Sequence, residues 1–232
     1  MEHDYSKSYV FETPTCTKTG IEHIQCVRCY SIIERNLPKK HEYADGFCTL
    51  CGIEEPPFPD VYHDCYYYDA VKWALAEGIT NGLTPTQFGP DEACTRAEVV
   101  TFLWRAAGCP EPTTAENPFS DVEEGKWYYD AVLWAVEEGI TEGYEDTDLF
   151  GTGDTCTRGQ IATFLYRCAK EPVLSSTENP FTDLNENAFY YTAVLWAVEN
   201  GITNGYADTT EFGPMNECTR GQIVTFLYRV YN

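Results

Sequence analysis

The order of apolar and polar residues repeats three times between residues 58 and 232, at intervals of 61 or 62 residues. Each repeat has an aromatic-rich segment that leads into a wide apolar stripe, as in A-V-L-W-A-V at 131–136. A stripe of this width predicts a helix buried on several sides, and Gly139 followed by Ile140 is typical of the end of such a helix. Apolar residues at i, i+3, i+4 and i+7 within 223–230 predict a second helix.

A twelve-residue segment at the start of the second helix is nearly the same in all three repeats. It reads CTRAEVVTFLWR at 94–105, CTRGQIATFLYR at 156–167 and CTRGQIVTFLYR at 218–229. Thr followed three residues later by Glu or Gln predicts a capping box at each helix start. The resulting helix–loop–helix units are expected over 58–112, 119–172 and 181–232. One helix pair cannot cover both of its apolar stripes, so the repeats must pack together, as an open stack or a closed pseudo-threefold arrangement.

Residues 1–57 contain no copy of this repeat and differ from it in composition. Two C-x2-C pairs separated by eighteen residues have the spacing of a zinc ribbon, in which four thiolates close one tetrahedral zinc site. The predicted zinc ligands are Cys26, Cys29, Cys48 and Cys51. Two disulfides or redox chemistry are the alternatives, and Cys16, His23 or His41 could replace a ligand. The expected fold is therefore mainly α, with a small Cys-rich, zinc-ribbon-like module in front.

Composition and charge narrow the possible partners. The chain of 232 residues is 43% hydrophobic and carries a net charge of −22, which excludes a nucleic-acid binder and docking on anionic lipid by charge. No apolar run approaches membrane-spanning length, so membrane insertion is not expected. The first residues lack the apolar core of a signal peptide, so for an exported protein we expect the export signal to lie outside this sequence.

The few basic residues of the repeats occupy equivalent positions. Residues 58–232 hold 28 Asp and Glu but only nine Lys and Arg, and six of those nine are arginines of the twelve-residue segment. Arg105, Arg167 and Arg229 lie near a helix C-terminus, where the helix dipole favours a cation, so they are expected to be structural. The other three lie at the first helical position, where the dipole disfavours them. Those three are Arg96, Arg158 and Arg220.

An arginine at a position where the helix dipole disfavours it, repeated in all three repeats, suggests a functional role. An arginine beside free helix N–H groups would bind a carboxylate or phosphate well. The alternative is that each arginine pairs with an acid in its own fold, such as Asp60, Asp121 or Asp183 of the F-x-D motif, which are also candidate ligand-binding residues. The tryptophans of the first helix are expected in the core, with stacking on a sugar as the alternative. They are Trp73, Trp134 and Trp196.

The remaining signals point away from catalysis. No His follows His63, and the sequence has no G-x-S-x-G, H-E-x-x-H or Gly-rich phosphate loop. Cys94, Cys156 and Cys218 precede the N-cap in every repeat and are expected to be small buried side chains. Cys65, Cys109 and Cys168 occupy non-equivalent positions, and the sequence does not pair them.

Taken together, these motifs resemble the S-layer homology family. The matching motifs are F-x-D-V at 119–122, W-Y-Y-D-A-V-L-W-A at 127–135, G-I-T-x-G, F-G-P at 88–90 and 212–214, and T-R-A-E at 95–98 or T-R-G-Q in the other two repeats. The resemblance implies a pseudo-threefold module that attaches exported proteins non-covalently to the bacterial cell wall. It also implies an anionic secondary cell wall polysaccharide as ligand, often pyruvylated, bound in grooves between repeats by the T-R-A-E arginine. Glu142 in G-I-T-x-G and F-G-T in the second repeat depart from the pattern.

The resulting hypothesis is a non-catalytic anchor at the cell surface of a Gram-positive-type bacterium. Two alternatives stay open at this point. The repeats could bind a peptide or another surface protein, or they could be the wall-targeting part of a hydrolase whose catalytic domain lies outside this sequence.

Overall fold

A computed structural model describes residues 3–16, 18–37, 39–113 and 116–232. The chain divides into two compact units, Met1–Pro56 and Pro57–Asn232. We call them the N-terminal unit and the repeat region, and each is described by itself.

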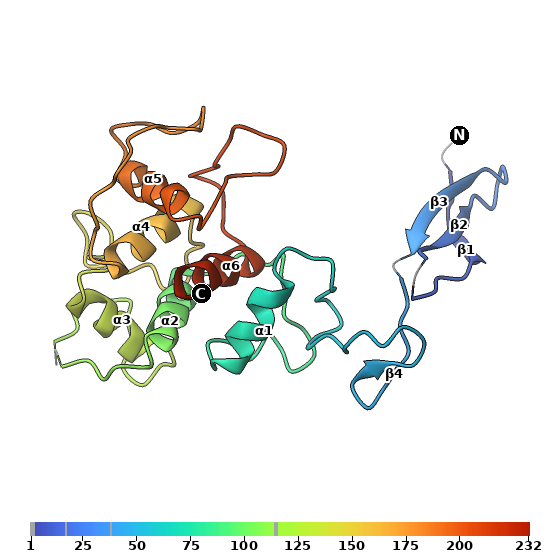
Figure 1. The fold of residues 1–232 in the computed structure, drawn as a ribbon, viewed down its shortest axis with the longest axis horizontal. Coiled ribbons are helices and arrows are strands. Elements are labelled where there is room, and N and C mark those ends of the chain that lie inside the picture. Colours follow the sequence, from blue (N-terminus) through green and yellow to red (C-terminus); the bar gives the residue numbers. More distant parts are fainter. Residues whose placement is uncertain (1–2, 17, 38, 114–115) are drawn as a thin grey trace. The chain divides into compact units, whose positions relative to one another are not determined.

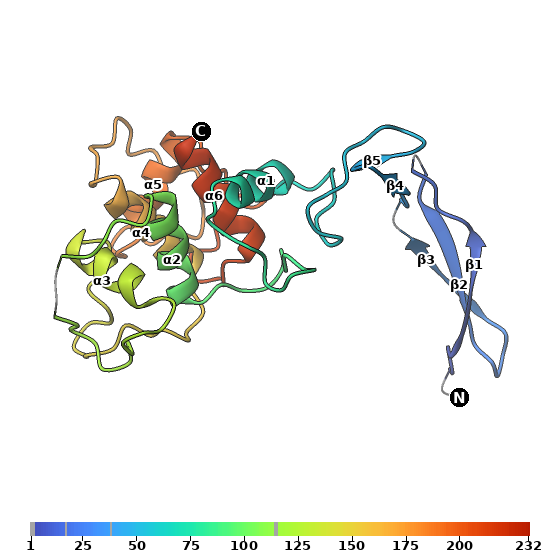
Figure 2. The same ribbon diagram turned by 90° about the horizontal axis from the view of Figure 1, so that it is seen from below.

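The N-terminal unit is built from short strands (Figure 2). Strands β1 (Lys7–Glu12), β2 (Gly20–Gln25) and β3 (Ile32–Leu37) form an antiparallel sheet in that order, and β4 (Tyr43–Ala44) pairs with β5 (Phe47–Cys48). Its described part has almost no apolar core. The residues buried there are Gly20, His23, Cys26 and Cys48.

Each repeat contains two helices, at the places that the apolar stripes predict. They are α1 (Tyr68–Ala76) and α2 (Arg96–Ala106), α3 (Tyr129–Glu137) and α4 (Arg158–Cys168), and α5 (Tyr191–Glu199) and α6 (Arg220–Tyr231). All three capping boxes are present, and the first helices end on glycines with positive φ, as at Gly139. Helices make up only about a quarter of the chain. The expectation of a mainly α fold therefore holds in part, because long loops join the helices and the N-terminal unit is β.

The repeats close into a ring. The first helix of each repeat packs against the second helix of the repeat before it, which pairs α3 with α2, α5 with α4, and α1 with α6. The pair α1–α6 joins the first repeat to the last, so an open stack is excluded. Figure 1 shows α2 and α6 near the centre of the repeat region, with α1, α3 and α5 spread around them.

Three buried cysteines lie where the repeats meet. The N–H of Cys94 donates to the carbonyl of Cys218, that of Cys156 to Cys94, and that of Cys218 to Cys156, at 2.8 to 3.0 Å. This closed triangle of backbone hydrogen bonds has threefold character. All three side chains are 0% exposed, which confirms that they are small buried side chains, and this burial raises the pKa of each thiol.

Candidate functional site: the interfaces between repeats

An arginine from each repeat enters the next repeat at the start of the second helix. The Nε atoms of Arg96, Arg158 and Arg220 donate to the carbonyls of Phe150, Phe212 and Phe88, each at 2.8 Å. The three residues are only 2 to 3% exposed. These arginines therefore have a structural role, because each one joins two neighbouring repeats of the ring. The phenylalanine that each one contacts belongs to the F-G motif.

The F-x-D aspartates hold those F-G turns in place. Asp60 accepts from the N–H groups of Phe88 and Gly89, at 3.0 and 2.8 Å. Asp121 and Asp183 do the same in their own repeats. The F-x-D aspartates are therefore not the acids that pair with these arginines, but the alternative holds for Arg220, which pairs with Glu98 of the same protein. Partial burial raises the pKa of Asp121, but the backbone N–H groups of the turn donate hydrogen bonds to its carboxylate. These bonds outweigh the effect of burial and bring the pKa below its ordinary value.

The helix N–H groups beside the arginines are not free. The amides of Arg158 and Gly159 donate to the carbonyls of Asn216 and Pro214, both at 2.9 Å, and the third amide of the helix donates to the Thr157 hydroxyl. The other two helices repeat this pattern. The expectation that these amides would bind a ligand is wrong, because the neighbouring repeat supplies carbonyls that no side-chain pattern reveals.

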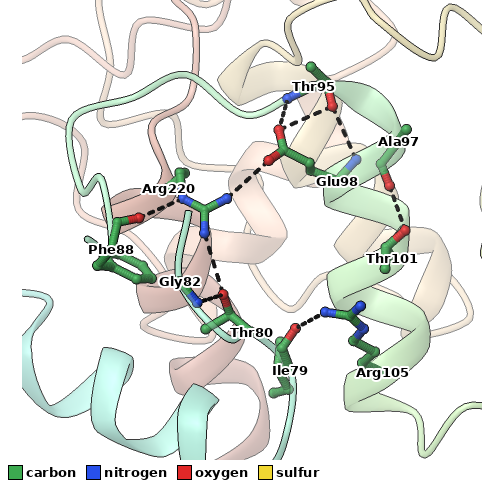
Figure 3. A network of polar contacts seen from close by, with 10 residues as sticks. All are labelled: Ile79, Thr80, Gly82, Phe88, Thr95, Ala97, Glu98, Thr101, Arg105 and Arg220. Carbon is green, nitrogen blue, oxygen red and sulfur yellow. Dashed lines mark hydrogen bonds and ion pairs between the residues drawn. The ribbon is translucent and has the colours of Figure 1, made fainter. Parts of the chain in front are cut away.

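The arginine between repeats 3 and 1 is neutralised within the protein. Figure 3 shows the Arg220 guanidinium donating through Nη1 to Glu98 Oε1 at 3.0 Å and through Nη2 to Thr80 Oγ1 at 3.4 Å. The same figure shows Arg105 donating to the carbonyl of Ile79. Arg167 and Arg229 make the equivalent bond in their repeats, which confirms the structural role of this second set.

The other two interfaces lack such an acid. Gln160 and Gln222 stand where repeat 1 has Glu98, and the Oε1 of each accepts the N-cap amide. The other end of each side-chain amide is an NH₂ group, which is a hydrogen-bond donor and therefore cannot accept a hydrogen bond from the arginine guanidinium. Within the described ranges, Arg96 and Arg158 have no ion-pair partner. The Nη2 atom of Arg158 is buried without any hydrogen-bond partner.

Tyrosine rings take the place of the missing acid. The Arg96 guanidinium carbon lies 4.6 Å from the ring centre of Tyr144, and that of Arg158 lies 4.4 Å from the ring centre of Tyr206. In repeat 1 the equivalent residue is Leu83. A cation over an aromatic face is stabilised by about 0.5–2 kcal/mol. Two of the three interfaces thus hold a guanidinium that is covered by an aromatic ring but has no anion.

The tryptophans of the first helices occupy two environments. Trp134 and Trp196 are buried in the core, and Trp73 is half-buried against Tyr228 and Tyr231 of α6. Of the three, only Trp73 keeps part of its surface accessible.

A set of exposed aromatic residues was missed by the sequence reasoning. Tyr66, Trp127 and Phe189 hold one equivalent position, two residues before each first helix, and are 57 to 62% exposed. Partial burial raises the pKa of Tyr66, and a hydrogen bond with Thr219 and the charge of Arg158 act against that rise. The residue after Tyr66, Tyr67, lies next to Gly221 at the start of α6, and the residue after Phe189, Tyr190, lies next to Gly159 at the start of α4. The signal was an aromatic residue conserved in type at one position of all three repeats.

The hollow found on the surface of the repeat region does not match an anionic ligand. A surface hollow lined by Asp208, Thr209, Thr210 and Glu211 is acidic and does not suit an anion. In the described part of the chain, no helix is both long and apolar enough to span a membrane.

The cysteines of the N-terminal unit do not form the single site that their spacing predicts. Cys26 and Cys29 cluster with His3, whereas Cys48 and Cys51 cluster with Cys16 and His41. Each cluster could hold a metal ion. His23 belongs to neither, since its ring contacts Tyr9 and Glu34.

Comparison with known proteins agrees with the repeat pattern. The S-layer homology domain matches residues 57–100, 118–162 and 180–224, more than half of the chain. An amylopullulanase of Thermoanaerobacterium thermosulfurigenes is 28% identical over 191 residues, 80% of this chain and 10% of that protein. A surface-layer 125 kDa protein of Lysinibacillus sphaericus is 32% identical over 147 residues, 60% of this chain and 12% of that protein. A cell surface protein of Thermoanaerobacter kivui is 33% identical over 91 residues, 38% and 12% respectively. The chain thus spans about a tenth of the length of these relatives.

Proposed function

Because the chain belongs to the S-layer homology family, whose domains are non-catalytic modules that anchor proteins to the bacterial cell wall, we propose that its repeats bind an anionic secondary cell wall polysaccharide. The anionic group of the polymer, such as a pyruvate ketal, is received between consecutive repeats by the guanidinium of Arg158. Arg96 provides a second site of the same kind. Arg220 does not take part, because Glu98 already neutralises it.

The unpartnered Nη2 atom of Arg158 is the observation that carries this proposal. A buried donor without an acceptor costs about 1–3 kcal/mol, and more when it is charged. A carboxylate from the polymer would remove that cost and add a charge-assisted, two-point hydrogen bond. Tyr206 covers the guanidinium and is only half-buried, so its ring would swing aside to admit the ligand.

The exposed aromatic residues suit the sugar part of the ligand. Tyr66, Trp127 and Phe189 offer flat apolar faces. Phe189 directly precedes Tyr190, whose ring lies next to Gly159, the residue after Arg158. The sugar-binding role predicted for Trp73, Trp134 and Trp196 stays a prediction, and Trp73 suits it better than the other two because it is half-exposed. The role of Asp60, Asp121 and Asp183 in binding also stays a prediction. In this structure they serve the F-G turns.

Equilibrium binding to purified wall polymer tests the proposal. The full chain is titrated with intact polymer and with polymer from which the anionic groups have been removed chemically. We expect the stripped polymer to lose most of its binding, and Phe189→Ala to weaken binding of the intact polymer. Equal binding to both polymers would refute the role of the arginines. Loss of binding to both after a protease treatment of the wall preparation would favour the rival function, a protein-interaction module.

The cargo of the anchor is a separate proposal. The amylopullulanase and the surface-layer protein match the chain over only 10% and 12% of their own lengths, so a glycan-degrading enzyme and a structural surface protein are both reasonable cargoes. The sequence of the whole gene decides between them.

A further inference from the structure

The two C-x2-C pairs of the N-terminal unit form the same turn twice. The N–H of Cys26 donates to the carbonyl of Ser31, and the N–H of Tyr30 donates back to the carbonyl of Cys26, both at 2.9 Å. Cys48 makes the equivalent bonds with Ile53 and Gly52, at 2.7 and 2.9 Å. The residue after the second cysteine has a positive φ in both turns, 64° at Tyr30 and 72° at Gly52. A turn that points two thiols at one spot is thus present in two copies.

A different part of the chain completes each turn. The N–H of Asp4 donates to Cys26 Sγ at 3.3 Å, and the N–H of Val27 donates to the carbonyl of Asp4. These bonds place His3 beside the first turn, with its Nδ1 atom 3.2 Å from Cys29 Sγ.

The second turn recruits its partners in the same way. The N–H of Lys40 donates to the carbonyl of Thr15, which brings the segments of Cys16 and His41 together. The Nδ1 atom of His41 lies 3.4 Å from Cys51 Sγ. Within each cluster, all ligand atoms lie within 4.8 Å of one another.

We propose that the N-terminal unit binds two zinc-type metal ions at two separate sites. Cys16, His41, Cys48 and Cys51 form a complete four-ligand site, and His3, Cys26 and Cys29 form a three-ligand site. This inference does not depend on polymer binding. Tetrahedral zinc with usual bond lengths separates a sulfur from a nitrogen ligand by about 3.6 Å and two sulfurs by about 3.8 Å. The observed His–Cys distances are within a few tenths of an ångström of that value.

The sites would supply the stability that the unit otherwise lacks. Two of the four residues that are buried in its described part, Cys26 and Cys48, are the first cysteines of the two turns, while Tyr9, Phe11 and Ile33 of the sheet are exposed. A unit of this size without an apolar core needs a metal or disulfides to fold, and every cysteine is a free thiol in this structure. Four-ligand sites are typical of structural zinc, and the three-ligand site leaves one position to water. We therefore expect the second ion to be held less tightly.

Metal counting on the full chain tests the proposal. The protein is loaded with zinc, freed of excess metal, and analysed for zinc per chain, and Co²⁺ is used as a spectroscopic probe of each site. We expect about two ions in the wild type and about one in each of Cys29→Ser and Cys51→Ser, with the cobalt spectrum of the untouched site unchanged. Cys109→Ser, an exposed cysteine outside both clusters, is the matched control and should keep both ions.

The rival outcomes are distinguishable. One ion per chain that is lost in both variants would show a single site made by all four cysteines. No bound metal, together with bridged thiols in a thiol titration, would show a disulfide-stabilised unit. Either result overturns the proposal. The helical circular dichroism of the repeat region shows whether a variant chain is otherwise intact, so a misfolded variant is not mistaken for loss of a site.

Discussion

Glu98→Gln isolates the ion pair that closes the ring. The substitution keeps the capping box, because Gln160 and Gln222 complete the same box in the other repeats. It removes only the charge and the acceptor opposite Arg220, whose bonds to Phe88 and Thr80 remain. The variant thus turns the third interface into the type found at the other two, but without their tyrosine, since Leu83 occupies that position.

The expected cost follows from the burial of the pair. The Arg220 side chain is 3% exposed and that of Glu98 is 23% exposed. A hydrogen bond to a charged group contributes about 1.5–3 kcal/mol, and the partial exposure of Glu98 reduces its share, so we expect a loss of about 2 kcal/mol. For a folded unit of this size, each kcal/mol shifts Tm by about 2–4 °C. The melting temperature should therefore fall by about 4–8 °C.

Thermal unfolding followed by far-ultraviolet circular dichroism measures this change. Adding Leu83→Tyr to Glu98→Gln supplies the ring that covers Arg96 and Arg158, and we expect it to restore about 1 kcal/mol. Glu111→Gln removes an exposed negative charge and controls for the general relief of repulsion. A melting temperature of Glu98→Gln within 1 °C of that control would refute the reasoning, because the buried pair would then contribute nothing to the ring.

Two further variants test the ring and its turns. Gly221→Ala places a Cβ 2.9 Å from the Tyr67 ring and 3.1 Å from the carbonyl oxygen of Pro90, so we expect it to lower the free energy of unfolding by about 1–3 kcal/mol. Ala97→Gly, at the equivalent position of repeat 1, is the control and should cost about 1 kcal/mol. Similar denaturation midpoints for the two variants would argue against the close approach. The lowered pKa of Asp121 means that its carboxylate contributes stability that is complete above the unfolded pKa of about 4 and is lost as the pH falls through the folded pKa. Asp121→Asn should therefore flatten the fall of Tm between about pH 5 and pH 3, and an unchanged slope would contradict this assignment.

Local features of the repeats could be predicted from the sequence because their causes are local. The capping box at Thr95, the glycine end at Gly139 and the apolar stripe of α3 each involve neighbours a few residues apart. The structural role of the second arginine set was also predicted correctly, although the carbonyl that each one contacts, as Arg105 contacts Ile79, follows the first helix of its repeat and does not belong to the end of its own helix. The family follows from the order and spacing of the motifs.

The partners across the ring could not be predicted in the same way. Arg158 donates to the carbonyl of Phe212, and Gly159 to that of Pro214, and a backbone carbonyl leaves no trace in the pattern of side chains. For the same reason the T-R-G-Q glycine gave no sign of its purpose, which is to let the backbone of the next repeat approach.

For the metal ligands too, the local turns could be predicted from the sequence, but the ligands that come from distant segments could not. The C-x2-C spacing correctly marks two turns that gather thiols. It does not say whether the turns face each other, and distant backbone hydrogen bonds give one of them His3 and the other Cys16.

The role of the unneutralised arginines is tested most directly by placing an acid opposite them. Gln160→Glu with Gln222→Glu reproduces at Arg96 and Arg158 the arrangement that Glu98 makes with Arg220, and it should not lower Tm. Titration of this double variant with purified anionic wall polymer should show affinity at least tenfold below that of the wild type, because each new carboxylate takes the guanidinium and repels the anionic group. Wild-type affinity in the double variant would show that the polymer is held elsewhere.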